Sequence, residues 1–192
     1  MEERISIENR KPRKSRKPDA DRKGMIGILK SKVFIAFSVL ISLVLICLLV
    51  FPIYRIEDES MYPTLKKGDI VVGVPLKAKQ GDIVAVRYNR FLLIRRVISG
   101  GGQKFDMNDS GHIYINTIEL EEPYISSFSR GNYDIALPYD IPDDRLFIVG
   151  DNREECIDSR SSVVGTVSGD MIDSVILIRI WPLINISFLY NR

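Results

Sequence analysis

The chain has few residues that bind metals or form disulfides, because among its 192 residues it contains one histidine and two cysteines. These are too few soft ligands for a zinc finger or a zinc ribbon. Cys47 and Cys156 stand far apart with no further cysteine, which excludes a disulfide framework. We therefore expect neither a metal nor a cofactor.

The chain also lacks a strong excess of one charge, since 27 basic and 25 acidic residues leave a formal net charge of +2. A protein that coats nucleic acid with its whole surface is more basic than this, so we expect no nucleic-acid partner. With 45% apolar and 27% charged residues, the composition is that of a folded chain. Its length allows one domain plus a short appendage.

One long stretch lacks charge entirely, since no charged residue occurs between Lys32 and Arg55. Residues 33–54 are mostly Val, Ile, Leu and Phe, and about 20 helical residues cross a hydrocarbon core of about 30 Å. A buried core helix rarely lacks polar residues over such a length. A cleaved signal peptide has a shorter apolar region followed by small residues. The stretch predicts an uncleaved transmembrane helix over residues 33–54.

The residues before this stretch are basic, with eleven Lys and Arg against five Asp and Glu in residues 1–32. A basic segment directly before a membrane helix follows the positive-inside rule and can contact anionic lipid. We expect residues 1–32 to be a disordered cytoplasmic tail. The same rule predicts that residues 33–54 cross the cell membrane and that residues 55–192 lie on its outer side.

The rest of the chain consists of short runs rich in β-branched residues, separated by Gly, Pro, Asn and Asp. No segment shows a long 3.6-residue period, so the pattern is mainly β and predicts a single β domain. The apolar residues 181–190 are too few to cross a membrane and suit a last strand or an aromatic patch at the membrane interface. The predicted strands lie within residues 69–74, 82–88, 91–98, 112–116, 146–149 and 174–180.

Three segments carry the candidate chemistry: residues 60–69 (SMYPTLKKGD), 94–98 (IRRVI) and 150–160 (GDNREECIDSR). In this order, after an N-terminal membrane helix, they resemble type I signal peptidase (signal peptidase I), a family of serine endopeptidases that remove signal peptides. The resemblance extends from about residue 25 to Trp181. It implies a signal-peptidase-like antiparallel β domain with Ser60 as the nucleophile. It also implies secreted preproteins as substrates and the protein-export machinery as a partner.

The distance of Ser60 from the apolar stretch fits this resemblance, because about nine extended residues reach about 30 Å at most. Ser60 is therefore expected near the outer membrane face. Asp158 and Arg160 are two residues apart, so both side chains can project to one side of an extended segment. The resemblance implies that these two residues support the site, and we expect Arg96 to support it as well.

The sequence departs from the family at three positions around the nucleophile. Arg95 stands where the family has its general-base lysine, and a guanidinium, unlike a lysine amine, does not deprotonate in proteins. Asp58 replaces a small residue near the oxyanion site, where a carboxylate opposes the developing negative charge. Cys156 replaces a serine that orients the lysine in many relatives. His112 does not stand at the position of the base histidine of endoplasmic-reticulum relatives.

Two hypotheses follow from these departures. In one, the site is rebuilt: Asp58 accepts the Ser60 proton and is held by Arg95, although pairing with arginine makes a carboxylate a weaker base. In the other, the site is degenerate, and the protein is an accessory that binds extended peptides at an open sheet edge during surface-protein or pilus assembly. The motif around Ser60 favours the enzyme, whereas Arg95, Asp58 and Cys156 favour the binder.

Overall fold

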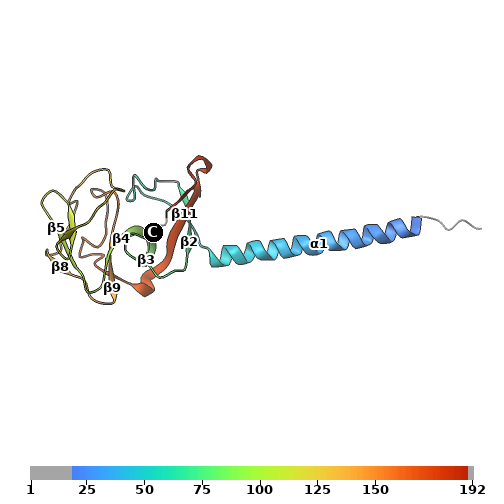
Figure 1. The fold of residues 1–192 in the computed structure, drawn as a ribbon, viewed down its shortest axis with the longest axis horizontal. Helices are drawn as coiled ribbons and strands as arrows, with labels where there is room; N and C mark the ends of the chain where they lie inside the picture. The colour runs from blue at the N-terminus through green and yellow to red at the C-terminus, as the bar shows by residue number, and fades with distance from the viewer. Residues whose placement is uncertain (1–18, 190–192) are drawn as a thin grey trace, which may run out of the picture. The chain divides into compact units, whose positions relative to one another are not determined.

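The computed structural model describes residues 19–189. The chain divides into two units, with the boundary between Leu45 and Ile46. Helix α1 (Asp19–Val50) contains the first described residues, and every described strand belongs to the second unit (Figure 1). Among the described residues, no helix combines the length and the apolar character that crossing a membrane requires. The transmembrane helix over residues 33–54 stays a prediction.

Helix α1 begins and ends earlier than the predicted boundaries. Residues 19–32 are helical, although the sequence predicted a disordered tail over residues 1–32, of which residues 1–18 lie outside the described part. Extending an existing helix adds one hydrogen bond per residue and needs no new nucleus, which explains why the helix continues into residues 19–32. At the other end, Pro52 disfavours continuation, and Ile53–Arg55 form strand β1 instead of helix.

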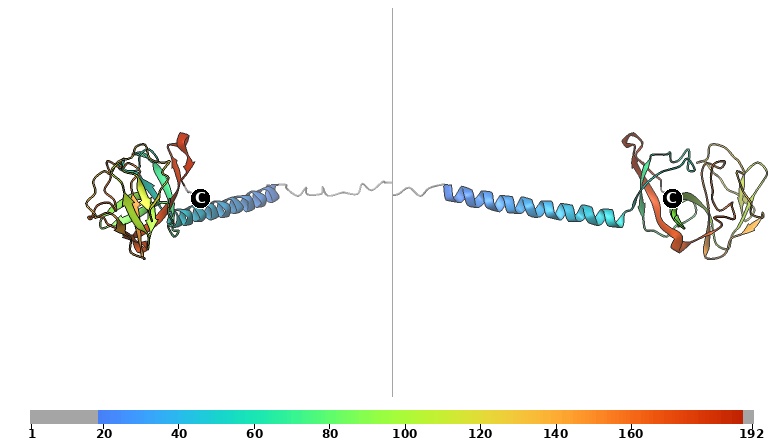
Figure 2. Two further views of the ribbon diagram at one scale, coloured as in Figure 1. Left: turned by 60° about the vertical axis from the view of Figure 1, so that its left-hand side comes forward. Right: turned by 180° about the vertical axis from the view of Figure 1, so that it is seen from behind.

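The larger sheet contains eight of the described strands, and every pairing in it is antiparallel. Its order is β1-β2-β11-β3-β4-β9-β10, and β12 pairs with β11 outside this path. The long strand β11, drawn in red and orange, lies beside β2 in Figure 1 and is seen from behind in Figure 2. The strands are β1 (Ile53–Arg55), β2 (Ile70–Val74), β3 (Ile83–Tyr88), β4 (Phe91–Gly100), β9 (Arg145–Val149), β10 (Val167–Ser168), β11 (Ile172–Trp181) and β12 (Ser187–Phe188).

A smaller antiparallel sheet has the order β7-β6-β5-β8 among the described strands. It consists of β5 (Lys104–Met107), β6 (Ile113–Ile115), β7 (Ile118–Glu119) and β8 (Tyr139–Asp140). Short 3-10 helices, η1 (Gly169–Met171) and η2 (Leu183–Asn185), flank β11. The prediction of a mainly β fold is confirmed, and each of the six predicted runs overlaps a strand.

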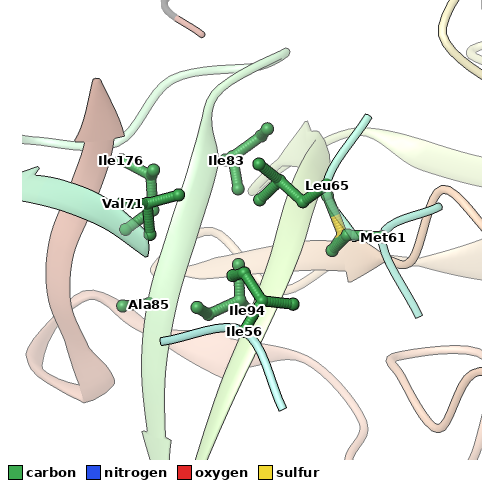
Figure 3. Close-up of a cluster of buried hydrophobic side chains, with 8 residues drawn as sticks. All are labelled: Ile56, Met61, Leu65, Val71, Ile83, Ala85, Ile94 and Ile176. Carbon is green, nitrogen blue, oxygen red and sulfur yellow. The ribbon is translucent and has the colours of Figure 1, made fainter. Parts of the chain in front are cut away.

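The core next to the nucleophile segment fixes that segment to the larger sheet. Met61 and Leu65 are both fully buried in one cluster with Ile56, Ile83 and Ile94, and Figure 3 shows Leu65 between Ile83 and Met61. Burying such side chains stabilises the fold by about 1.5–3 kcal/mol each. Because Met61 directly follows Ser60, this packing determines where the serine lies.

Of residues 181–190, the structure describes those up to Leu189. The predicted last strand is present in part, because Ser187 and Phe188 form β12 and pair with β11. Trp181, Ile184 and Phe188 are exposed by 50%, 91% and 83%. An aromatic patch at the membrane interface therefore remains a proposal for this hairpin.

Candidate active site

The nucleophile segment is held by hydrogen bonds to the turn that follows β9. The backbone N–H of Asn152 donates to the Ser60 carbonyl at 2.9 Å, and the Asn152 side chain donates to the Glu59 carbonyl at 3.2 Å. The Thr64 hydroxyl donates to Asp151. These contacts join two segments that are about 90 residues apart in sequence and carry two of the three motifs.

The Ser60 hydroxyl lies in a row of three polar side chains. Ser60 is 2% exposed, and its Oγ donates to Asp58 Oδ1 at 2.6 Å. The Arg95 Nη1 donates to the same Oγ at 2.6 Å. The backbone N–H of Ser60 also donates to Asp58 Oδ1, at 3.1 Å. The hydroxyl is therefore held between an acceptor carboxylate and a cationic donor.

The Arg95 guanidinium is fixed by oxygen atoms from three segments. Besides Ser60 Oγ, Nη1 donates to the Ile94 carbonyl at 2.6 Å, and Nε and Nη2 each donate to the Ile157 carbonyl at 3.1 Å. Arg95 is 3% exposed, and its place on β4 is set by pairing with Val84 of β3. The nearest approach of Arg95 Nη2 to Asp58 Oδ2 is 3.9 Å, which is longer than a hydrogen bond.

Asp158 and Arg160 form a buried ion pair beneath the turn. The Arg160 Nε and Nη2 donate to the two Asp158 oxygens at 2.9 and 2.8 Å, and the Gly150 N–H donates to Asp158 Oδ2 at 3.0 Å. Burial raises the pKa of Asp158, but the hydrogen bonds and charge of Arg160 outweigh it and hold that pKa below the ordinary value. Arg160 also donates to the carbonyls of Arg130 and Arg153, so the pair connects three loops.

Cys156 packs against the backbone of the same turn. A Cβ atom on Gly150 would lie 2.2 Å from Cys156 Sγ and 2.7 Å from the Ser60 carbonyl oxygen, so only glycine fits there. Burial, followed by the charge of Asp158, raises the pKa of Cys156 to about 12. Within residues 19–189, no hydrogen bond connects Cys156 to Ser60 or Arg95, in contrast to the orienting serine that the family resemblance implied at this position.

Arg96 lies next to the row without touching Ser60. Its Nε and Nη2 donate to the two Asp151 oxygens at 2.8 and 2.6 Å, and its guanidinium stacks 3.9 Å from the centre of the Tyr124 ring. Arg96 contacts the nucleophile segment in two ways: its Nη2 donates to the Thr64 hydroxyl at 3.4 Å, and Asp151, which it binds, also accepts from Thr64. His112 is remote from this row: it precedes β6 in the smaller sheet, where its Nδ1 lies 2.7 Å from Glu119.

Sequence reasoning missed a further buried ion pair, formed by Glu122 and Arg153. Their side chains are 0% and 1% exposed, and Arg153 also donates to the Gly150 carbonyl at 3.0 Å. The Tyr124 hydroxyl donates to Glu122 at 2.9 Å. Arg153 belongs to the GDNR motif, which signalled a polar turn but not its partner. No sequence signal distinguishes Glu122 from its exposed neighbour Glu121.

A buried serine hydroxyl between a carboxylate and a cationic donor has the parts of a serine-nucleophile site. The family model described as "Signal peptidase, peptidase S26" matches residues 29–181. The chain belongs to this family.

Two bacterial signal peptidases agree with this assignment. Signal peptidase I T of Bacillus subtilis (strain 168) is 31% identical over 152 residues, covering 72% of this chain and 77% of that protein. Signal peptidase IB of Staphylococcus aureus (strain MRSA252) is 29% identical over 160 residues, covering 72% of this chain and 82% of that protein. A crystal structure of a signal peptidase I from Enterococcus faecalis V583 shows 24% identity and a TM-score of 0.42, covering 52% of this chain and 97% of that chain.

Proposed function

We propose that this protein is a membrane-anchored serine endopeptidase that removes signal peptides from secreted preproteins, with Ser60 as its nucleophile. The observation that carries this proposal is the buried Ser60 hydroxyl, hydrogen-bonded at 2.6 Å to both a carboxylate and a guanidinium. An ordinary surface serine has no such surroundings. Membership of the signal peptidase family supplies the reaction class.

An open sheet edge beside Ser60 supports an extended peptide as the substrate. Strand β3 pairs with β4 along Phe91–Arg96, whereas β9 pairs with β4 only from Arg96 onward. Within the described part of the chain, residues 91–95 therefore have a strand on one side only. A peptide added along this edge would gain main-chain hydrogen bonds. Its backbone would then pass the Arg95 end of the edge, where Ser60 lies.

The anchor is proposed from residues 33–54, which carry no charge. The described apolar side chains of this part of α1 are exposed, among them Phe34 at 71% and Leu45 at 56%. Exposed side chains of this kind need an apolar environment. The ten residues from Val50 to Ser60 span about 35 Å at most, so the site would stay near the outer face of the membrane. The basic tail would lie in the cytoplasm.

A second candidate is an accessory protein that binds extended peptides without cleaving them. It is favoured by the Ser60 N–H, which donates to Asp58 at 3.1 Å. In serine proteases the N–H of the nucleophile commonly stabilises the oxyanion. A carboxylate at this position competes with that role. In this case, the open edge of β4 would hold a peptide for surface-protein or pilus assembly.

Cleavage of a model preprotein by the full-length protein in detergent micelles distinguishes the two candidates. The enzyme hypothesis predicts a product that begins after a small residue, and loss of this product in Ser60→Ala. A matched control is Ser127→Ala, because Ser127 is exposed in a loop and its removal should leave cleavage unchanged. Peptide binding that is equal in wild type and Ser60→Ala, with no cleavage by either, would instead establish the accessory.

Labelling with a membrane-impermeant maleimide tests the topology. In a background with Cys47 and Cys156 replaced by alanine, a cysteine at exposed position 127 should react in intact cells. A cysteine at position 15 in the basic tail should react only after permeabilisation. The reverse pattern would contradict the proposed orientation.

A further inference from the structure

The described site lacks the amine base that its family resemblance implies. Arg95 occupies the lysine position, and a guanidinium has donors only, with no lone pair to accept a proton. Its hydrogen bonds to the carbonyls of Ile94 and Ile157 further fix all three of its nitrogen atoms as donors. Arg95 therefore cannot remove the Ser60 proton.

Among the described residues, the side-chain acceptor that contacts the Ser60 hydroxyl is Asp58 Oδ1, at 2.6 Å. We propose that Asp58 accepts the Ser60 proton during acyl transfer and that Arg95 acts as a fixed cation that stabilises negative charge developing on Ser60 Oγ. This proposal rests on the proposed endopeptidase function and assigns its proton path. It differs from a serine–lysine site in that the cation and the base are two separate residues.

The geometry separates these two roles. Arg95 is 3% exposed, so its charge acts on Oγ through a region with little water, where electrostatic interactions are strong. The Asp58 side chain is 62% exposed, and its Oδ2 lies 3.9 Å from Arg95 Nη2. Arg95 does not hold the carboxylate through a hydrogen bond. Asp58 is thus able to rotate between Ser60 and a departing amine.

The proton path balances over the two half-reactions. Ser60 Oγ forms a bond to the scissile carbonyl carbon, its proton passes to Asp58, and the carbonyl electron pair moves onto the carbonyl oxygen. Asp58 then gives this proton to the amide nitrogen as the C–N bond breaks, which leaves an ester on Ser60. A water molecule next loses a proton to Asp58 and attacks the ester carbon. Asp58 then gives this proton to Ser60 Oγ as the ester C–O bond breaks and the carboxyl product leaves.

The same step provides an oxyanion donor. In the resting site, the Ser60 N–H is taken by Asp58 Oδ1 at 3.1 Å. A protonated carboxyl is a weaker acceptor than a carboxylate. Transfer of the Ser60 proton to Asp58 therefore releases this N–H when the carbonyl oxygen becomes negative. The contact that opposes catalysis in the resting site is removed by the first chemical step.

The proposal is tested by two rates in the full-length protein: modification of Ser60 by a fluorophosphonate, quantified by mass spectrometry, and cleavage of a model preprotein. Asp58→Asn keeps the shape and an acceptor oxygen but cannot take the proton, so we expect both rates to fall about 10²–10⁴-fold. Glu57→Gln is the matched control, because it removes an exposed charge next to Asp58. It should leave both rates unchanged.

Arginine variants test the second role. Arg95→Met should lower both rates as Asp58→Asn does, whereas Arg95→Lys, which retains the cation, should lower them less. If both rates in Arg95→Lys rose above those of the wild type, the role of Arg95 as a fixed cation would be overturned, because the new lysine would then act as the base. Thermal unfolding of each variant checks that the fold is retained.

Failure of this inference is distinguishable from failure of the proposed function. Wild-type rates in Asp58→Asn, together with loss of both in Ser60→Ala, would overturn the inference and leave the function intact. If the fluorophosphonate modified Ser60 in the wild type but not in Asp58→Asn, and no preprotein were cleaved, the proposed function would be overturned and the role of Asp58 would stand. Absence of any Ser60-dependent reaction in the wild type would overturn both.

Discussion

Replacing Glu122 by glutamine is expected to destabilise the β domain strongly. The Glu122 and Arg153 side chains are 0% and 1% exposed, so the variant leaves a buried guanidinium without a counter-charge. Removing one partner of a buried pair costs about 3–5 kcal/mol in the free energy of unfolding. Glutamine retains one acceptor oxygen, which places the expected loss near 3 kcal/mol, equivalent to a decrease in Tm of about 6–12 °C. Because Arg153 also donates to the Gly150 carbonyl, preprotein cleavage should decrease as well.

Urea unfolding in detergent, followed by circular dichroism of the β signal, measures this loss. Glu121→Gln is the matched control, since Glu121 is exposed and its neutralisation should change the free energy of unfolding by less than about 0.5 kcal/mol. Replacing both partners, as in Glu122→Leu with Arg153→Met, should cost less than Glu122→Gln alone, because no unpaired charge remains. A loss below about 1 kcal/mol in Glu122→Gln, or a double variant no more stable than it, would refute the reasoning.

Three further predictions concern the turn below Ser60. Arg160 holds the pKa of Asp158 below its ordinary value, so the pair stabilises the fold above about pH 4, and this stability is lost as the pH falls through the folded-state pKa. The urea midpoints at pH 6 and pH 3 should therefore differ less in Asp158→Asn than in the wild type. Since burial raises the pKa of Cys156 to about 12, iodoacetamide at pH 8 should modify this thiol only after unfolding, and peptide mass spectrometry showing rapid native modification would contradict this. Gly150→Ala should reduce cleavage at least tenfold, since the added Cβ would lie 2.7 Å from the Ser60 carbonyl oxygen; wild-type kinetics would show that the turn moves without disturbing Ser60.

The strands of the fold follow from local sequence patterns where those patterns are long. Residues 82–88 and 91–98 are rich enough in β-branched and other apolar residues to predict β3 and β4 within two residues of their observed ends. The two-residue strands β7, β8, β10 and β12 are too short to produce a period, so they depend on their partners. The division into two sheets likewise depends on long-range pairing, for example of Lys104 with Asp140.

The candidate site was predictable in its residue types but not in its connections. The motifs identified Ser60 and Arg95, and the departure from the family identified Asp58; the structure brings these three side chains together. The Ile157 carbonyl that binds Arg95 could not be predicted, because every residue carries such a group and only tertiary structure selects one. The Glu122–Arg153 pair joins residues 31 positions apart, and two adjacent glutamates give no sign of which one is buried.

The central claim, that Ser60 is the nucleophile of a peptide-cleaving site, is tested most directly by trapping its ester. The full-length protein would be mixed with a model preprotein, quenched with acid within one turnover, digested and analysed by mass spectrometry. We predict that the peptide containing Ser60 carries the carboxyl-terminal part of the signal peptide, and that Ser60→Ala carries none. Cleavage that persists in Ser60→Ala, or an acyl group attached to a different residue, would contradict the account.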